Sequence, residues 1–185
     1  MRVIAGKAKG RRLKSPGLGT RPMTDRMKES VFSSLGEFKG VRVLDLYAGS
    51  GSLGLEALSR GAKSARFVES ARDAIVKLEE NIETTALGSK SEVTWADVGS
   101  TLSLGADERF DLVFLDPPYS MPVAGVRADL ETIVMNGFLS DKGRIVVHRP
   151  AKESQLKPLG LEMLWEKEYG QSRIVVFCHE EEEDG

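Results

Sequence analysis

Asp116-Pro117-Pro118-Tyr119 places a carboxylate, two prolines and an aromatic ring directly after the apolar run 110–115. Proline fixes φ at about −65° and offers a carbonyl without an N–H donor. The corner therefore presents two acceptors, the Asp116 carboxylate and the Pro117 carbonyl, beside the flat ring of Tyr119. Such a set suits a planar base that is held by its exocyclic NH₂ group.

A glycine-rich turn supplies a second candidate site. Apolar residues over 41–46 predict a buried strand, and residues 52–60 predict a helix. A strand, a glycine turn and a helix cradle adenosine-bearing cofactors, and the spacing of these glycines also matches a dinucleotide site. Asp45 at the strand end would repel a pyrophosphate and attract the ammonium group of a methionine moiety. The turn therefore favours S-adenosylmethionine (SAM) over NAD. The glycines are Gly49, Gly51 and Gly54.

Four acids fall at the ends of successive predicted strands. They are Asp45, Glu69, Asp97 and Asp116. Ligands of open α/β sheets bind outside the carboxyl ends of the strands, so we expect these acids on one rim. Glu69 can accept hydrogen bonds from two ribose hydroxyls. Asp97 can accept the adenine amino group or cap the helix that follows it.

Charge is unevenly distributed along the chain. Residues 1–28 hold nine Lys and Arg against one acid, a net of +8, so a total of −2 leaves −10 for the remainder. A basic arm on an acidic body is typical of nucleic-acid binding, although a solvated flexible tail has the same composition. Residues 3–5 and 12–13 can pair as a small hairpin. The predicted RNA contacts are Lys9, Arg11, Arg12, Arg21 and Arg26.

Alternating strand and helix patterns predict an α/β fold with a mostly parallel, seven-stranded sheet and helices on both faces. Thr24 is the expected N-cap of a helix before the first strand, and Ser70 with Asp73 resembles a capping box for helix 71–85. His148 and Arg149 end a predicted strand, where they flank the RNA or cap the strand. The predicted divisions are a basic arm at 1–20, a catalytic domain at 21–178 and a disordered acidic tail at 179–185.

Several classes of protein are disfavoured by the sequence. No apolar run approaches 18 residues, and the N-terminus lacks the apolar segment of a signal peptide, so we expect a cytoplasmic protein that spans no membrane. Cys178 alone makes no internal disulfide and no zinc or iron–sulfur site. We expect no metal.

Three segments together resemble a known family. Residues 45–51 with 116–119 look like a class I SAM-dependent amino-methyltransferase, and residues 21–29 narrow the resemblance to the bacterial RsmD type. The resemblance spans about 1–178. It implies a Rossmann-like fold and a monomer that methylates the N2 amine of a guanine in 16S rRNA within the small ribosomal subunit. It implies that the target base is held by Asp116, Pro117 and Tyr119. The residues that it implies for SAM binding are Thr24, Asp45, Tyr47, Ala48, Gly49, Gly51, Glu69 and Asp97.

The expected reaction is direct attack of the amine on the SAM methyl group. Asp116 and the Pro117 carbonyl accept the two N–H hydrogens, and Tyr119 stacks on the extruded base. Adenine also carries an exocyclic NH₂, so an adenine-N6 methyltransferase, acting on RNA or DNA, is the nearest alternative. A non-catalytic RNA-binding module and an NAD-dependent oxidoreductase are the more distant ones.

Overall fold

A seven-stranded sheet organises the chain, which a computed structural model describes over residues 1–17 and 21–183. The strand order is β3-β2-β1-β4-β5-β7-β6. β1 to β5 run parallel, which agrees with the predicted mostly parallel sheet, and β7 pairs antiparallel with both β5 and β6. The strands are β1 Arg42–Leu46, β2 Ser64–Glu69, β3 Ser91–Trp95, β4 Phe110–Leu115, β5 Leu139–Pro150, β6 Leu161–Tyr169 and β7 Ser172–His179.

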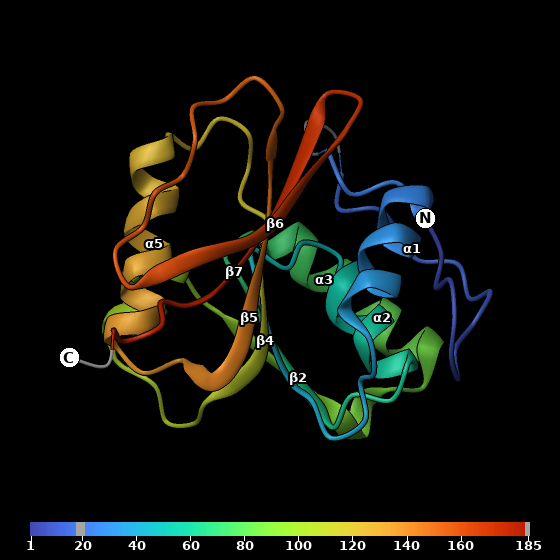
Figure 1. Cartoon of the computed structure of the whole chain (residues 1–185). Helices are drawn as coiled ribbons and strands as arrows, with labels where there is room; N and C mark the ends of the chain where they lie inside the picture. Colours follow the sequence, from blue (N-terminus) through green and yellow to red (C-terminus); the bar gives the residue numbers. More distant parts are fainter. Residues whose placement is uncertain (18–20, 184–185) are drawn as a thin grey trace.

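Helices cover both faces of this sheet, and Figure 1 shows α1, α2 and α3 on one side and α5 on the other. The core divides accordingly into two apolar clusters, one under α1, α2 and α3 and one under α4 and α5. Central strands are buried on both faces, which explains their unbroken apolar runs. The helices are α1 Asp25–Leu35, α2 Ser52–Ser59, α3 Arg72–Thr85, α4 Val98–Ser103 and α5 Val123–Met135, with a 3₁₀ turn η1 at Gly88–Lys90.

One of the two helix caps predicted from the sequence is observed, and the other is not. Thr24 caps α1, where its hydroxyl accepts from the backbone N–H of Met27 at 3.2 Å. The predicted capping box of Ser70 and Asp73 is wrong. Ala71 is the N-cap of α3 and makes no side-chain cap bond, because its methyl group has no acceptor; its own N–H donates to the carboxylate of Glu69 at 2.7 Å.

The basic arm begins as a small hairpin, as predicted. Val3 N–H donates to Arg11 at 2.9 Å, and Gly10 N–H donates back to Val3 at 2.9 Å. Val3, Ala8 and Leu13 are buried in the core cluster of α1 to α3, so this stretch packs on the body and is no flexible tail. Residues 18–20 of the predicted arm lie outside the described part of the chain.

The carboxyl end of the chain differs from its prediction. β7 extends to His179, whose ring Nε2 lies 3.2 Å from the Leu139 carbonyl. Glu180 N–H donates to the Gly160 carbonyl at 3.0 Å. Residues 179 and 180 are therefore held by the sheet and its neighbouring turn, against the prediction of a disordered segment from 179. Residues 184–185 of that segment lie outside the described residues.

Candidate active site

A cavity of about 480 Å³ opens at the carboxyl ends of β1, β2 and β4. Its wall includes Asp45, the glycine turn, Glu69 and the corner 116–120, and Met1 with residues 16 and 21–23 closes the other side. The structure thus brings the two candidate sites of the sequence together in one cavity. Parallel strands place their carboxyl ends on one edge, so Asp45 and Asp116 meet although 71 positions separate them.

Asp45 is the most deeply buried acid of this cavity, at 1% exposure. Its Oδ2 accepts from Gly54 N–H at 3.0 Å, whereas Oδ1 is buried without a hydrogen-bond partner in the described part of the chain. Burial raises the pKa of Asp45 well above its usual range, and the charges of Asp116 and Glu69 raise it further. A buried carboxylate oxygen without a partner is costly unless a donor reaches it. The ammonium group of a methionine moiety is such a donor, so this end of the cavity fits SAM.

The glycine turn is closed by Glu69 at the end of β2. Gly49 N–H donates to Glu69 Oε1 at 2.9 Å, and Ala71 N–H occupies Oε2. Gly49 and Gly51 both have positive φ, of 58° and 84°. A Cβ on Gly51 would overlap the side chain of Leu78. Both Glu69 oxygens therefore already accept one backbone bond, and a ribose hydroxyl would use a remaining lone pair of each.

Tyr47 is held in an unusual conformation at the start of the turn. Its φ is 57°, a region that non-glycine residues seldom adopt. Its hydroxyl donates to Asp129 of α5 at 2.6 Å, and burial followed by this bond raises the pKa of Tyr47 above its usual value. Burial likewise raises the pKa of Asp129. Asp129 thus fixes a cavity residue, and no local signal in the sequence pointed to it.

The backbone carbonyls of the acceptor corner differ in their hydrogen bonds. The Pro118 carbonyl accepts from Met121 N–H at 3.0 Å and from Arg149 at 3.2 Å. The Pro117 carbonyl accepts no hydrogen bond from the described residues. The guanidinium of Arg21 lies 5.7 Å above the Tyr119 ring. A base that enters the cavity therefore meets an aromatic ring next to one available carbonyl.

His148 and Arg149 lie beneath this corner, with His148 1% exposed and Arg149 fully buried. His148 Nδ1 lies 2.9 Å from Asp116 Oδ1, and its Nε2 lies 3.0 Å from the Tyr119 hydroxyl. Arg149 donates hydrogen bonds to the carbonyls of Pro118 and Met121 and forms a salt bridge with Glu153. Of the two roles left open for them, contact with the RNA does not fit these buried side chains, which support the corner from beneath.

Three predicted cofactor residues, Thr24, Gly51 and Asp97, are not part of the cavity wall. Thr24 is occupied as the cap of α1, and the preceding residues Arg21, Pro22 and Met23 line the cavity instead. Asp97 caps α4, where its Oδ2 accepts from the N–H and the hydroxyl of Ser100 at 2.9 and 3.1 Å. The capping alternative for Asp97 is thus observed. Its contact with adenine stays a prediction.

Comparison with known proteins assigns this chain to a family. A family model described as "Conserved hypothetical protein 95" matches residues 1–178. The chain belongs to this RsmD-type methyltransferase family. It is 35% identical to the Ribosomal RNA small subunit methyltransferase D of Haemophilus influenzae, over 92% of this chain and 89% of that protein. The Bacillus subtilis protein YlbH is 38% identical over 96% of this chain and 98% of its own.

Solved structures agree with the RsmD-type assignment. The Escherichia coli protein yhhF superposes with a TM-score of 0.85 at 31% identity, covering 97% of this chain and 98% of that chain. The Thermus thermophilus protein TTHA0928 gives a TM-score of 0.77 at 30% identity, with 95% and 98% covered. The class I methyltransferase fold predicted from the sequence is confirmed.

The predicted RNA contacts of this RsmD-type chain lie on its surface. Lys9, Arg11, Arg12, Arg21 and Arg26 are all exposed. Lys28, which the sequence counted with the basic arm, is 1% exposed and lies 3.7 Å from the buried Glu56. Burial lowers the pKa of Lys28, and the nearby Glu56 carboxylate opposes this shift. Lys28 is therefore a structural residue and adds nothing to the basic surface.

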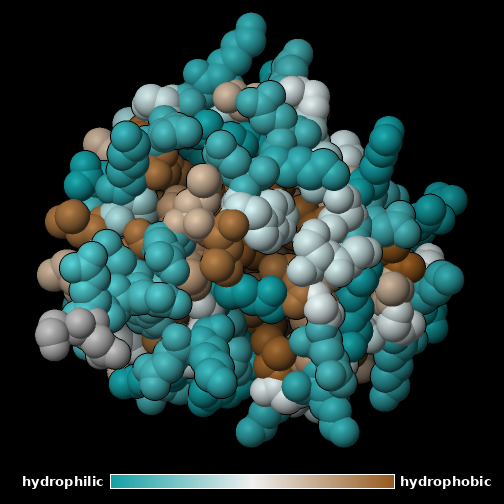
Figure 2. Space-filling view, viewed as in Figure 1, coloured by the Kyte–Doolittle hydropathy of each residue, from teal (hydrophilic) through white to brown (hydrophobic). Residues whose placement is uncertain are grey.

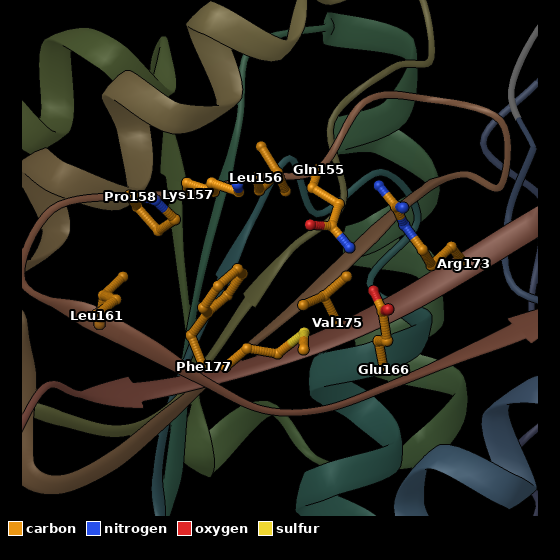
Figure 3. A pocket seen from close by; sticks show the side chains of 10 residues that line it. Gln155, Leu156, Lys157, Pro158, Leu161, Glu166, Arg173, Val175 and Phe177 are labelled. Carbon is orange, nitrogen blue, oxygen red and sulfur yellow. The ribbon is translucent and has the colours of Figure 1, made fainter.

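A second cavity, of about 300 Å³, lies between β6, β7 and residues 155–158, away from the glycine turn. Figure 3 shows Arg173 and Glu166 at one end of it and Leu161 with Pro158 at the other. Figure 2 shows hydrophobic atoms near the centre of the face that β6 crosses in Figure 1. β6 contributes Met163 and Leu164, each about half exposed. We assign the chemistry to the first cavity because Asp45, Glu69 and Asp116 converge only there among the described residues.

No helix of the described residues is long and apolar enough to cross a membrane.

Proposed function

We propose that this protein transfers a methyl group from SAM to the exocyclic N2 amine of one guanine in the 16S rRNA of the small ribosomal subunit. The observation that carries the proposal is the pairing, in one cavity, of a buried carboxylate oxygen without a partner and a corner with acceptors for an amine. The first feature fits the cationic end of SAM, and the second fits an exocyclic NH₂. Relatives named for small-subunit rRNA support this substrate class, and the reaction that we propose is cytoplasmic.

Five of the proposed cofactor residues line that cavity, namely Asp45, Tyr47, Ala48, Gly49 and Glu69. Asp45 binds the ammonium group, the backbone of 47–51 approaches the methionine end, and Glu69 accepts the ribose hydroxyls. Gly49 and Gly51 allow this approach, because a side chain at either would be strained at positive φ. Asp97 and Thr24 would contact the cofactor from the rim. SAM, when bound, supplies a methyl group on a positively charged sulfur.

The acceptor corner prepares the amine for attack. The lone pair of the guanine N2 is delocalised into the ring, which makes the amine a poor nucleophile. Acceptance of one N–H by Asp116 and the other by the Pro117 carbonyl draws the nitrogen toward a pyramidal geometry and exposes the lone pair. A carboxylate is too weak a base to deprotonate the free amine. The nitrogen becomes acidic once it carries the methyl group, and Asp116 then takes the proton.

Positioning dominates the expected rate gain. Well-oriented reactants lower a barrier by about 7–11 kcal/mol relative to free ones. Tyr119 stacks on the extruded base, which returns about 1–3 kcal/mol of the cost of unstacking it. The exposed arm residues contact phosphates and give binding a steep dependence on salt. Arg21, over the Tyr119 ring, links the arm to the site.

The test is incubation of hypomethylated small subunits, and separately of their naked RNA, with labelled SAM. We expect label on N2 of a single guanine, mapped by nuclease digestion and mass spectrometry. Label on adenine N6 would replace the guanine assignment, and no label on either substrate would overturn the proposal. Asp116→Asn, which keeps the shape of the side chain, is the matched negative control.

A further inference from the structure

Four side chains form a continuous hydrogen-bonded chain under the acceptor corner. Asp116 Oδ1 lies 2.9 Å from His148 Nδ1, and His148 Nε2 lies 3.0 Å from the Tyr119 hydroxyl. The same hydroxyl lies 2.7 Å from Ser172 Oγ. The chain joins the end of β4 to β5 and to the first residue of β7. It therefore connects the proposed amine acceptor to the proposed stacking ring through the interior of the sheet.

For a neutral imidazole beside an ionised Asp116, the donor count sets the direction of each bond. An ionised Asp116 only accepts, so the proton of the neutral imidazole lies on Nδ1 and Nε2 accepts. The Tyr119 hydroxyl then donates to Nε2, and the Ser172 hydroxyl donates to Tyr119. In this arrangement each of the four side chains has a hydrogen-bond partner. The reverse arrangement would need a proton on Asp116, because a neutral imidazole that donates from Nε2 has no proton on Nδ1.

We propose that His148 is a positioning residue, which commits Asp116 Oδ1 to its ring and leaves Oδ2 as the oxygen that receives the substrate amine. This inference rests on the proposed function and adds a residue to it. Asp116 is 22% exposed in its side chain and His148 1%, so the free oxygen faces the cavity while the bonded one faces the protein. The imidazole also packs edge-on against Tyr119, with ring centroids 5.5 Å apart and an angle of 71°.

One ring thus orients both contacts of the target base. Rotation of the Asp116 carboxylate would break the bond to Nδ1, and displacement of Tyr119 would break the bond to Nε2. Buried hydrogen bonds are stronger than exposed ones, and a misplacement of about 1 Å in an active site can lower a rate about 10²-fold. His148 therefore affects the methyl-transfer step without touching the substrate.

The test uses a matched pair of variants, His148→Asn and His148→Leu. Asn and Leu have the same branched heavy-atom shape, but only Asn can donate to Asp116 Oδ1. We expect His148→Leu to lower the single-turnover rate about 10²-fold with an unchanged Kd for SAM, and His148→Asn to recover most of that loss. If His148 only filled buried space, the apolar Leu would replace it at least as well as Asn. A His148→Leu variant as active as His148→Asn would therefore overturn the inference.

A double-mutant cycle tests the link to the ring. Tyr119→Phe removes the hydroxyl and keeps the aromatic face. We expect it to slow transfer in the wild-type background and to have little further effect in His148→Leu, because coupled residues are not additive. Full additivity of the two rate losses would show that the four hydrogen-bonded side chains do not act as a unit.

A spectroscopic measurement keeps this inference separate from the proposed function. The chain has two histidines, so the ¹⁵N resonances of His148 are assigned by comparison with His179→Gln. We expect a neutral ring with the proton on Nδ1, and loss of that tautomer in Asp116→Ala. A ring protonated on Nε2 alone in the wild type would refute the positioning role even if rRNA is methylated. Absence of methylation with the Nδ1–H tautomer present would refute the proposed function alone.

Discussion

Replacement of Asp45 by Asn tests whether the cavity is built for a cation. The two side chains have the same shape, so the change removes a charge without opening a void. Oδ2 accepts from Gly54 N–H, and Oδ1 has no partner in the described residues. An amide that keeps the bond to Gly54 turns its NH₂ group toward the place of Oδ1. Hydrogen bonds to charged groups contribute about 1.5–3 kcal/mol, so we expect the Kd for SAM to rise about 10- to 150-fold.

The same variant should keep or gain stability near neutral pH. The pKa of Asp45 is raised in the folded state, chiefly by burial and then by the charges of Asp116 and Glu69. A group with a raised folded pKa contributes stability below its unfolded pKa of about 3.9, and this contribution is lost as the pH rises through the folded value. A tenfold difference in proton affinity between the two states corresponds to about 1.4 kcal/mol. The Tm of the wild type should therefore fall relative to that of Asp45→Asn between about pH 4 and the raised pKa.

Two measurements check this pair of expectations. Calorimetric titration gives the Kd for SAM, and thermal melts between pH 4 and pH 8 give the Tm difference. Asp141→Asn is the control, because that side chain is 92% exposed and far from any cavity residue in the sequence. A Kd within twofold of the wild type would refute the role of Asp45. So would a loss of affinity that is matched by a loss of Tm, since unfolding would then explain it.

Three further predictions concern other parts of the molecule. Asp116→Ala should abolish methyl transfer in a labelled-SAM assay and leave the Kd for SAM nearly unchanged; near-normal turnover contradicts its role. Replacement of Arg11 and Arg12 by Ala should weaken RNA binding and reduce the slope of log K against log salt concentration by about 1.4, because each neutralised phosphate accounts for roughly 0.7 of that slope. Filter-binding titrations measure the slope, and an unchanged value would show that these two arginines do not contact the RNA. Lys28→Met should lower the free energy of unfolding in urea by about 3 kcal/mol, because it removes one of the two cations beside the buried Glu56 carboxylate and leaves Arg60 at 3.6 Å. Restoration of part of this loss by Glu56→Gln is expected, and a neutral Lys28→Met would show that the pair is not needed.

The sequence predicted the parts of the site that depend on local order. The turn at 47–51 lies between an apolar strand and a helix, and this pattern alone places Asp45 at the rim. The corner at 116–119 follows the same rule, because it directly follows a buried strand. Their meeting in one cavity followed from the parallel sheet. These features need only the chain direction and the period of the apolar residues.

The supporting contacts could not be predicted because they join distant segments. His148 reaches Asp116 across 32 positions, and Tyr47 reaches Asp129 across 82. No spacing rule connects residues on neighbouring strands or on a strand and a remote helix. Lys28 was misread for a related reason. Its charge matched the basic arm, and only the packing of α1 against α2 shows that Glu56 lies beside it.

The attachment of the hairpin to the body constrains how substrate preference can change. Glu56 of α2 binds Ile4 N–H at 2.8 Å, and Ser59 binds the N–H of Ala8 at 2.9 Å and the carbonyl of Ala5 at 2.6 Å. Asn81 binds the carbonyls of both Lys14 and Ser50, at 3.0 and 2.9 Å. On the arm side each of these contacts is made by a backbone group, so an arm of another sequence that keeps the hairpin conformation would keep them. The basic hairpin is thus held as a fixed unit against α2 and α3, and exchange of its exposed arginines and lysines would alter the proposed RNA contacts without removing these anchors.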